Sequence, residues 1–282
     1  MNEKKLLALW GLKHNPFLPS IPTECLWSPP GLDVFFLKVE SLVRHGGFAL
    51  ISGEPGSGKS KVLQLLAGRL EQLGELAVGV MERPQSRIGD FYRELGDLFG
   101  VTLTPANRYG GFRALRARWR SHLKSTLMRP VLLVDEAQQM DTDPLSELRI
   151  LSSAHFDSEC LLTTVLCDDG RLSDRFRSRD LLPLDGRIRT RLLLDPYSPQ
   201  ELCDFLDHAM DKAGATELMT HELTRTLCEH AGGNLRTLVN MAAELLDAAA
   251  ERQITTLNED LFFEVFARSV KPKSQKSPRR KQ

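Results

Sequence analysis

Gly53-Glu54-Pro55-Gly56-Ser57-Gly58-Lys59-Ser60 follows the apolar run Phe48-Ala49-Leu50-Ile51 and leads into a helix-like stretch from Lys61 onward. It matches G-x-x-x-x-G-K-[ST], the phosphate-binding loop that joins a strand to a helix. Glycines let consecutive backbone N–H groups turn toward phosphate oxygens, and the dipole of the following helix favours the same negative charge. The sequence therefore predicts an ATP site formed by Gly53, Glu54, Pro55, Gly56, Ser57, Gly58, Lys59, Ser60 and Lys61.

Within this loop, Lys59 is expected to contact the β- and γ-phosphates and Ser60 to bind Mg²⁺. A second motif supplies acids: Val131-Leu132-Leu133-Val134-Asp135-Glu136 is an apolar strand that ends in two carboxylates, the form of a Walker B motif. Asp135 is expected to hold Mg²⁺ and Glu136 to act as general base for the attacking water. A pair of solvated acids at an ordinary strand end is the alternative, and the phosphate-binding loop upstream disfavours it.

Apolar strand-like runs alternate with amphipathic helical stretches up to Asp195, which predicts an α/β fold with a parallel sheet covered by helices on both faces. The sheet elements are expected at 48–52, 77–80, 131–134, 161–167 and 192–194. After that point the pattern is helical throughout, opening with the capping box Ser198-Pro199-Gln200-Glu201. The predicted organisation is an irregular, proline-rich segment 1–33, a P-loop ATPase domain 34–195, a small helical lid domain 196–269 and a basic disordered tail 270–282.

The neutral net charge of the chain conceals a segregation of charge. Residues 106–129 and residues 268–282 each contain seven basic residues and no acidic one, which leaves an excess of acids elsewhere. Such asymmetry favours an anionic partner. No apolar run approaches the roughly 18 residues of a membrane span, and the charged start resembles no secretory leader. Together with five widely spaced cysteines, this predicts a cytoplasmic protein without membrane partners.

The first basic segment also reads as a helix. Phe112, Leu115, Trp119 and Leu123 form an apolar stripe at helical spacing, and a basic stripe lies beside it. The basic stripe supplies the candidate DNA-binding residues Arg113, Arg116, Arg120 and Lys124. Contacts of this kind would bind phosphates without reading base sequence. The alternative is a helix that covers the sheet with a solvated arginine face.

Further arginines could complete an ATPase site. Arg187, Arg189 and Arg191 are expected between the last two sheet elements, where one of them could reach the γ-phosphate of a neighbouring subunit. Arg236 follows Gly232-Gly233-Asn234 at the start of a predicted lid helix, where a cation needs an anionic partner. Solvated basic side chains are the alternative for each.

Taken together, these motifs resemble those of the AAA+ ATPases, in particular the group of ExeA-like proteins and the transposition regulators TnsC, TniB and MuB. The resemblance covers residues 8–268 and rests on the loop and acid motifs above and on further short stretches. These are Gly11-Leu12-Lys13-His14-Asn15-Pro16-Phe17, Val134-Asp135-Glu136-Ala137-Gln138, Leu148-Arg149-Ile150-Leu151-Ser152 and Gly232-Gly233-Asn234-Leu235-Arg236.

By that resemblance, Asp168 takes the sensor-1 position, where the family usually has Asn or Gln. Arg187 matches the trans arginine finger better than Arg191, and Arg236 matches sensor 2. The resemblance also implies hexamers or helical filaments that bind ATP and Mg²⁺. The expected function is an ATPase that oligomerises on double-stranded DNA, selects a transposition target and recruits a transposase, with or without a separate target-selection protein. Hydrolysis would drive disassembly.

Two other functions remain open. An ExeA-type ATPase of secretion assembly is one; such proteins carry a membrane span and a peptidoglycan-binding region after the ATPase domain, whereas this sequence ends in a basic tail. A signalling NTPase switch that binds no nucleic acid is the other.

Overall fold

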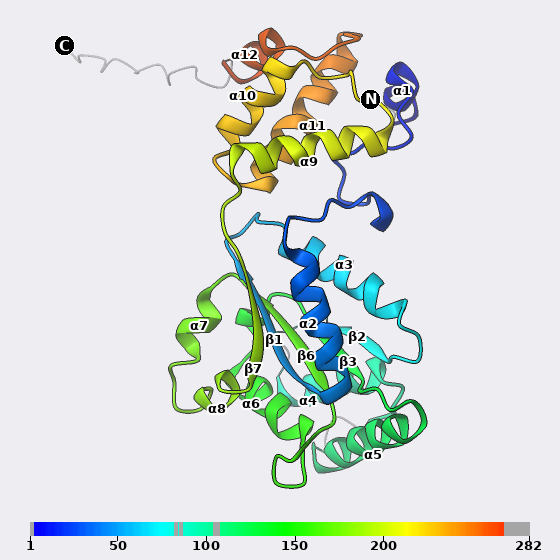
Figure 1. The fold of residues 1–282 in the computed structure, drawn as a ribbon, viewed down its shortest axis with the longest axis vertical. Coiled ribbons are helices and arrows are strands. Elements are labelled where there is room, and N and C mark those ends of the chain that lie inside the picture. Colours follow the sequence, from blue (N-terminus) through cyan, green and yellow to red (C-terminus); the bar gives the residue numbers. More distant parts are fainter. Residues whose placement is uncertain (1–2, 82–83, 85–86, 104–107, 268–282) are drawn as a thin grey trace, which may run out of the picture. The chain divides into compact units, whose positions relative to one another are not determined.

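Five parallel strands form the central sheet of the computed structural model, which describes residues 3–81, 84, 87–103 and 108–267 (Figure 1). Their order across the sheet is β2-β3-β6-β1-β7. The strands are β1 (Gly47–Gly53), β2 (Val78–Met81), β3 (Val131–Val134), β6 (Thr163–Asp168) and β7 (Ile188–Leu194). The two remaining strands, β4 (Ser153–Ala154) and β5 (Glu159–Cys160), pair antiparallel as a separate hairpin.

Helices cover both faces of the sheet, as predicted. Side chains alternate between the faces: Phe48 and Leu50 of β1 join one apolar cluster, and Ala49 and Ile51 join the other. One face packs against α2 (Leu32–His45) and α3 (Lys59–Glu71). The opposite face packs against α4 (Ile88–Leu98), α5 (Arg108–Thr126), α6 (Thr142–Ser152), α7 (Arg171–Arg175) and α8 (Leu182–Asp185). The short 3₁₀ helix η2 (Ala137–Gln139) follows β3.

The remaining helices make a second compact unit, formed by the described residues of 1–27 and 197–282, whereas those of 28–196 form the α/β unit. Its elements are α1 (Glu3–Trp10), the 3₁₀ helix η1 (Thr23–Cys25), α9 (Pro199–Ala213), α10 (His221–Ala231), α11 (Leu235–Glu251) and α12 (Glu259–Ala267). Sequence signals set its helix ends. The predicted capping box at Ser198 and Glu201 is present, α9 stops at left-handed Gly214, and Asn234 caps α11.

Three local predictions differ from the structure. The N-terminal segment contains α1, because Leu6, Leu12 and Phe17 are buried in the core of the helical unit. The pair Asp143-Pro144, a capping residue followed by proline, predicts a helix that starts at Pro144, but α6 begins at Thr142 after Asp141, two residues earlier. Strand β7 begins at Ile188 rather than Leu192, since pairing with β1 extends the ladder toward its amino end.

Among the described residues, no helix is both long enough and apolar enough to cross a bilayer. The predicted basic tail lies outside the described residues.

Candidate nucleotide site and the arginines around it

The phosphate-binding loop occupies the carboxyl end of β1 and the start of α3, as predicted. Gly56 and Gly58 have φ angles of +92° and +91°, in the left-handed region that favours glycine. A Cβ at Gly53 would lie 2.8 Å from Ser57 Oγ and 2.9 Å from the Leu194 carbonyl oxygen, so a side chain is excluded there. The loop is thus a tight backbone cradle that ends at a helix N-terminus.

Lys59 lies inside this cradle. The residue is 7% exposed, and Nζ donates hydrogen bonds to the carbonyl oxygens of Gly53 at 2.8 Å and Glu54 at 2.9 Å. A buried ammonium group surrounded by loop backbone is the donor set that fits the phosphates of a nucleotide. Ser60 is exposed as the second residue of α3, where its hydroxyl is available as a Mg²⁺ ligand.

The pairing of strands in the sheet brings the Walker B residue Asp135 close to Lys59. In the β3–β6 ladder Val134 pairs with Leu166, so the next residues, Asp135 and Cys167, are neighbours. The Cys167 thiol is hydrogen-bonded to Asp135, and the positive charge of Lys59 also acts on it. Burial, and then the charge of Asp135, raise the pKa of Cys167 well above its usual range. Lys59 and Asp135 are therefore brought together around one buried thiol.

Glu136 leaves the strand in a left-handed conformation, with φ at +51°, and its side chain is exposed. The side-chain amide of Gln138 donates to Glu136 Oε2 at 2.5 Å. Arg175 of α7 in turn donates to the Gln138 carbonyl oxygen at 2.7 Å. Gln138 belonged to the motif that suggested the family, but its contact with Glu136 could not be read from the sequence.

Asp168, the predicted sensor-1 residue, is fully buried at the end of β6. One carboxylate oxygen accepts a hydrogen bond from the Ser52 hydroxyl at 2.5 Å, because β1 and β6 pair with Ser52 opposite Asp168. The other accepts from the backbone N–H groups of Gly170 at 2.8 Å and Leu172 at 2.9 Å. Both oxygens thus join the ends of two strands to the start of α7.

Directly after Asp168 in the chain, Asp169 and Arg171 form an ion pair that the sequence alone did not predict. Arg171 Nε donates to both carboxylate oxygens of Asp169, at 3.0 and 2.8 Å. This hydrogen bond lowers the pKa of Asp169, and the charges of Lys59 and Glu136 act on this pair. Only the turn after β6 places them beside the phosphate-binding loop.

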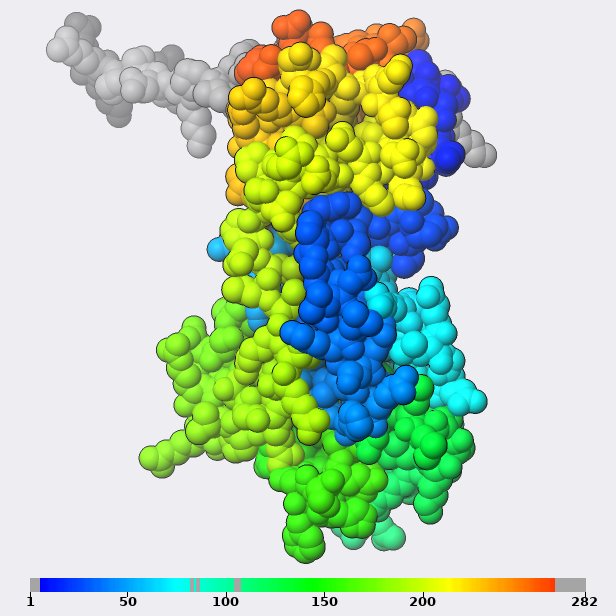
Figure 2. All heavy atoms as spheres, viewed as in Figure 1, coloured from blue at the N-terminus to red at the C-terminus, as the bar shows by residue number. Residues whose placement is uncertain are grey.

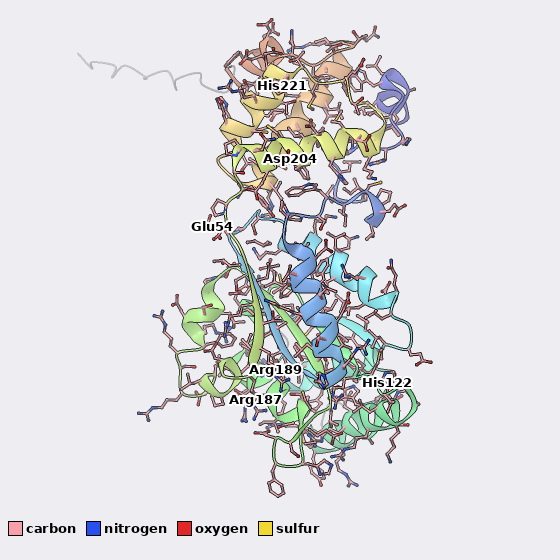
Figure 3. All side chains as sticks on the ribbon, viewed as in Figure 1. Glu54, His122, Arg187, Arg189, Asp204 and His221 are labelled. Carbon is pink, nitrogen blue, oxygen red and sulfur yellow. The ribbon has the colours of Figure 1, made fainter. Side chains whose placement is uncertain are left out.

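Arg187 lies at the opposite end of the sheet from the loop. It immediately precedes β7, whose first residue, Ile188, pairs with Phe48, whereas Leu194 at the other end pairs with Gly53. Figure 3 shows Glu54 and Arg187 at the two ends of these strands. Seven residues of strand span about 20 Å. Arg187 therefore cannot reach the loop of its own subunit, as a trans role requires.

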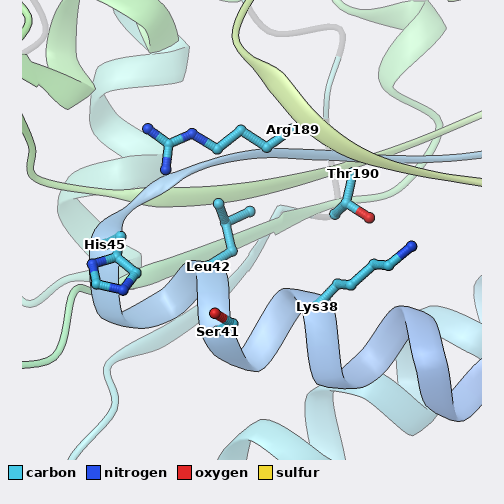
Figure 4. Close-up of a pocket in the computed structure, with 6 residues that line it drawn as sticks. All are labelled: Lys38, Ser41, Leu42, His45, Arg189 and Thr190. Carbon is cyan, nitrogen blue, oxygen red and sulfur yellow. The ribbon is translucent and has the colours of Figure 1, made fainter.

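Arg189 and Arg191 lie within β7, contrary to the prediction that they precede the last strand. Arg191 forms an ion pair with Asp185 at 2.6 Å. Arg189 lines a surface pocket, shown in Figure 4, with the other lining residues Lys38, Ser41, Leu42, His45 and Thr190. In Figure 2 the outer face of α2, in blue, lies beside β7, in yellow-green, along this side of the unit.

Arg236, the predicted sensor-2 residue, is exposed in the first turn of α11 in the helical unit. The side chain of the preceding cap residue Asn234 accepts from the Thr237 N–H at 3.1 Å. The predicted helix start is therefore present, and Arg236 projects from it as an exposed cation.

The Arg-rich helix α5 contains the predicted apolar stripe: Leu115 and Trp119 are buried, with Phe112 and Leu123 packed against the same core. Trp119 is thus unavailable for stacking on bases, whereas Tyr109 is 70% exposed. Arg113, Arg120 and Lys124 are exposed.

Arg116 differs from the other candidate DNA-binding residues. It stacks on Phe112 at 4.9 Å and donates to the carbonyl oxygens of Ile150, Leu151 and Ser153 at the end of α6. These bonds give it a structural role.

Comparisons with known proteins agree with this geometry. Residues 43–176 match the family model of the AAA domain. General secretion pathway protein A of Aeromonas hydrophila is 31% identical over 203 residues, which are 71% of this chain and 36% of that protein. The chain thus spans little more than a third of this relative.

Solved structures share the fold at low sequence identity. Cdc6p from Pyrobaculum aerophilum superposes with a TM-score of 0.67 at 14% identity, over 86% of this chain and 67% of that one. The Aeropyrum pernix ORC1 protein in complex with DNA gives a TM-score of 0.65 at 17% identity, over 90% and 68%. The parallel sheet, the complete phosphate-binding loop and the Walker B acid pair thus belong to a P-loop AAA+ fold, and residues 43–176 are similar to the AAA domain.

Proposed function

We propose that the chain hydrolyses ATP at sites shared between neighbouring subunits, and that the assembled subunits bind duplex DNA and regulate transposition. The position of Arg187 carries the shared-site part of this proposal, because an arginine some 20 Å of strand away from its own loop would have to act in hydrolysis at the loop of another subunit. A hexamer or a helical filament would supply that neighbour.

Each residue of the site has a defined part in this proposal. Lys59 and the loop N–H groups bind the triphosphate, and Ser60 and Asp135 would hold Mg²⁺, which would neutralise charge on the phosphates. Glu136 accepts a proton from the attacking water. Arg187 of the adjacent subunit stabilises the charge that develops in the transition state, and Arg236 senses the γ-phosphate from the lid. Asp168, with both oxygens engaged, holds the ends of β1 and β6 to the start of α7.

The DNA component is supported by the exposed cations Arg113, Arg120 and Lys124 on α5, in a helix with no acidic residue. It is also supported by the shared fold with the ORC1 protein that was solved with DNA. Phosphate contacts alone predict binding that tolerates any sequence and weakens steeply with salt. A transposase, with or without a target selector, would then be recruited to the DNA-bound assembly.

The test is retention of duplex DNA of unrelated sequences, with and without a non-hydrolysable ATP analogue, over a salt range of about 50 to 200 mM. The proposal expects retention that is stimulated by the analogue, and electron microscopy of the same samples distinguishes rings from filaments. Equal retention with and without the analogue at low salt, or no retention at all, contradicts it.

A role in secretion-apparatus assembly is the second candidate, favoured by the 31% identity to general secretion pathway protein A. A signalling switch without nucleic acid is the third. Hydrolysis rates separate the first proposal from the other two: duplex DNA should stimulate the enzyme under the first, whereas a protein effector should do so under the second and third.

A further inference from the structure

The hairpin formed by β4 and β5 has an unusual turn. Its residues His155, Phe156 and Asp157 all adopt left-handed conformations, with φ of +48°, +55° and +68°. Such a conformation costs a non-glycine residue roughly 1–2 kcal/mol, so three in succession persist only where surrounding contacts hold them. The contacts that the hairpin's side chains make should therefore indicate the role of this turn.

One of those contacts is Arg187. Its guanidinium forms an ion pair with the Asp157 carboxylate and donates to the Ser153 hydroxyl at 3.2 Å. The Ser153 hydroxyl in turn donates to Asp157. The three side chains form a closed hydrogen-bonded set that joins β4 and the turn of the hairpin to the residue before β7.

The hairpin is itself fixed from the other side. Arg116 of α5 donates to the Ser153 carbonyl oxygen, so the residue that bonds Arg187 through its hydroxyl is held through its backbone. The Arg187 side chain is 27% exposed, so most of its surface is covered by the protein.

We propose that Asp157 is a positioning residue for Arg187: with Ser153, it holds the guanidinium in the orientation in which it is donated to the ATP site of the adjacent subunit. This inference rests on the proposed trans role of Arg187. A guanidinium has five N–H donors. The bonds to Ser153 and Asp157 leave others for phosphate oxygens, and an arginine ordered in advance loses less side-chain entropy when it binds.

The experiment mixes two variants that are each inactive. Glu136→Gln binds ATP without hydrolysing it and still carries Arg187, so it serves as donor. Arg187→Ala retains Glu136 but lacks the donated arginine, so it serves as acceptor. At an interface where a Glu136→Gln subunit donates its Arg187 to an Arg187→Ala subunit, the acceptor site has both Glu136 and Arg187, and hydrolysis returns.

The donor is then changed to Glu136→Gln combined with Asp157→Asn or with Asp157→Gly. Both replacements tolerate the left-handed backbone at this position. Asn keeps an oxygen acceptor without charge and should restore part of the activity, whereas Gly should lower the recovered kcat about tenfold with KM unchanged, compared with 10³-fold or more for loss of the arginine itself. A donor with Glu229→Gln, which removes an exposed acid from the Arg225 pair in the helical unit, is the matched control.

The outcomes separate the two ideas. Full recovery with the Asp157→Gly donor, at unchanged thermal stability, overturns the positioning role and leaves the trans arginine intact. A fall in melting temperature with both Asp157 variants, and normal kcat, also overturns it, because Asp157 would then serve stability alone. No recovery even with the simple Glu136→Gln donor overturns the trans arrangement and this inference with it.

Discussion

The Gln138 side-chain amide donates a hydrogen bond to Glu136 Oε2 at 2.5 Å, and the Gln138 carbonyl accepts from Arg175 at 2.7 Å. The proposed general base is therefore tied to α7, the helix whose start is held by Asp168. This contact makes the orientation of Glu136 dependent on residues that have no chemical part in hydrolysis.

Replacing Gln138 with Ala should lower kcat for ATP hydrolysis by about tenfold, because an exposed Glu136 would lose its fixed orientation toward water. ATP binding should not change. Steady-state kinetics with a fluorescent-nucleotide binding assay measure both, and Gln139→Ala is the control at the neighbouring position. An unchanged kcat would contradict the orienting role, and an increased kcat would mean that the bond restrains Glu136.

Substitutions in the phosphate-binding loop and at the general base should separate nucleotide binding from ATP hydrolysis. Lys59→Ala removes the buried ammonium group inside the cradle, so nucleotide binding should be lost. Glu136→Gln keeps the cradle and should bind ATP while trapping the assembled state, since only proton abstraction is removed. Isothermal titration and size-exclusion chromatography with ATP follow the two effects. Normal hydrolysis by Glu136→Gln would disprove the general-base role.

Asp168→Ala should destabilise the α/β unit by about 2–4 kcal/mol, because the Ser52 hydroxyl and two N–H groups would lose their buried partner. Denaturant unfolding measures the effect. Asp169→Ala, at the next and more accessible acid, should cost much less, since its partner Arg171 is exposed. Equal losses for the two variants would contradict the structural role of Asp168.

The arginines of α5 should fall into two groups. Arg120→Ala removes an exposed cation and should reduce the slope of log affinity against log salt by about 1, with stability unchanged. Arg116→Ala removes the donor to three carbonyl oxygens and should lower stability by about 1–3 kcal/mol. DNA titrations at several salt concentrations, paired with unfolding curves, make the comparison. A stable Arg116→Ala protein with a reduced salt slope would assign Arg116 to DNA instead.

Alkaline pH should weaken the fold partly through Cys167. Burial, then Asp135, raise the pKa of this thiol above the ordinary value of 9.0, so it stays neutral in the folded chain while the unfolded chain ionises. Its contribution to stability is full below about pH 9 and is lost as pH rises further, at up to about 1.4 kcal/mol per pH unit. Urea unfolding between pH 8 and 10 should show a shallower decline for Cys167→Ala than for the natural chain. Identical slopes would contradict this.

Much of the fold and the core of the site could be predicted from local patterns. The loop from Gly53 to Ser60 and the acids Asp135 and Glu136 each lie within one strand and its following turn, so spacing along the chain suffices to define them. The capping box at Ser198 and the stripe through Leu115 and Trp119 are local in the same sense.

The tertiary structure alone decided how the remaining side chains are used. Arg116 and Arg120 are equivalent in the sequence, but only Arg116 meets the end of α6. Asp168 meets Ser52 because the register of β1 and β6 places residues 116 positions apart side by side. Arg187 meets Asp157, 30 positions away, across a hairpin with no sequence signal. Short-range spacing determines motifs that close within one turn, whereas these contacts depend on strand register and helix packing, which the whole core sets together.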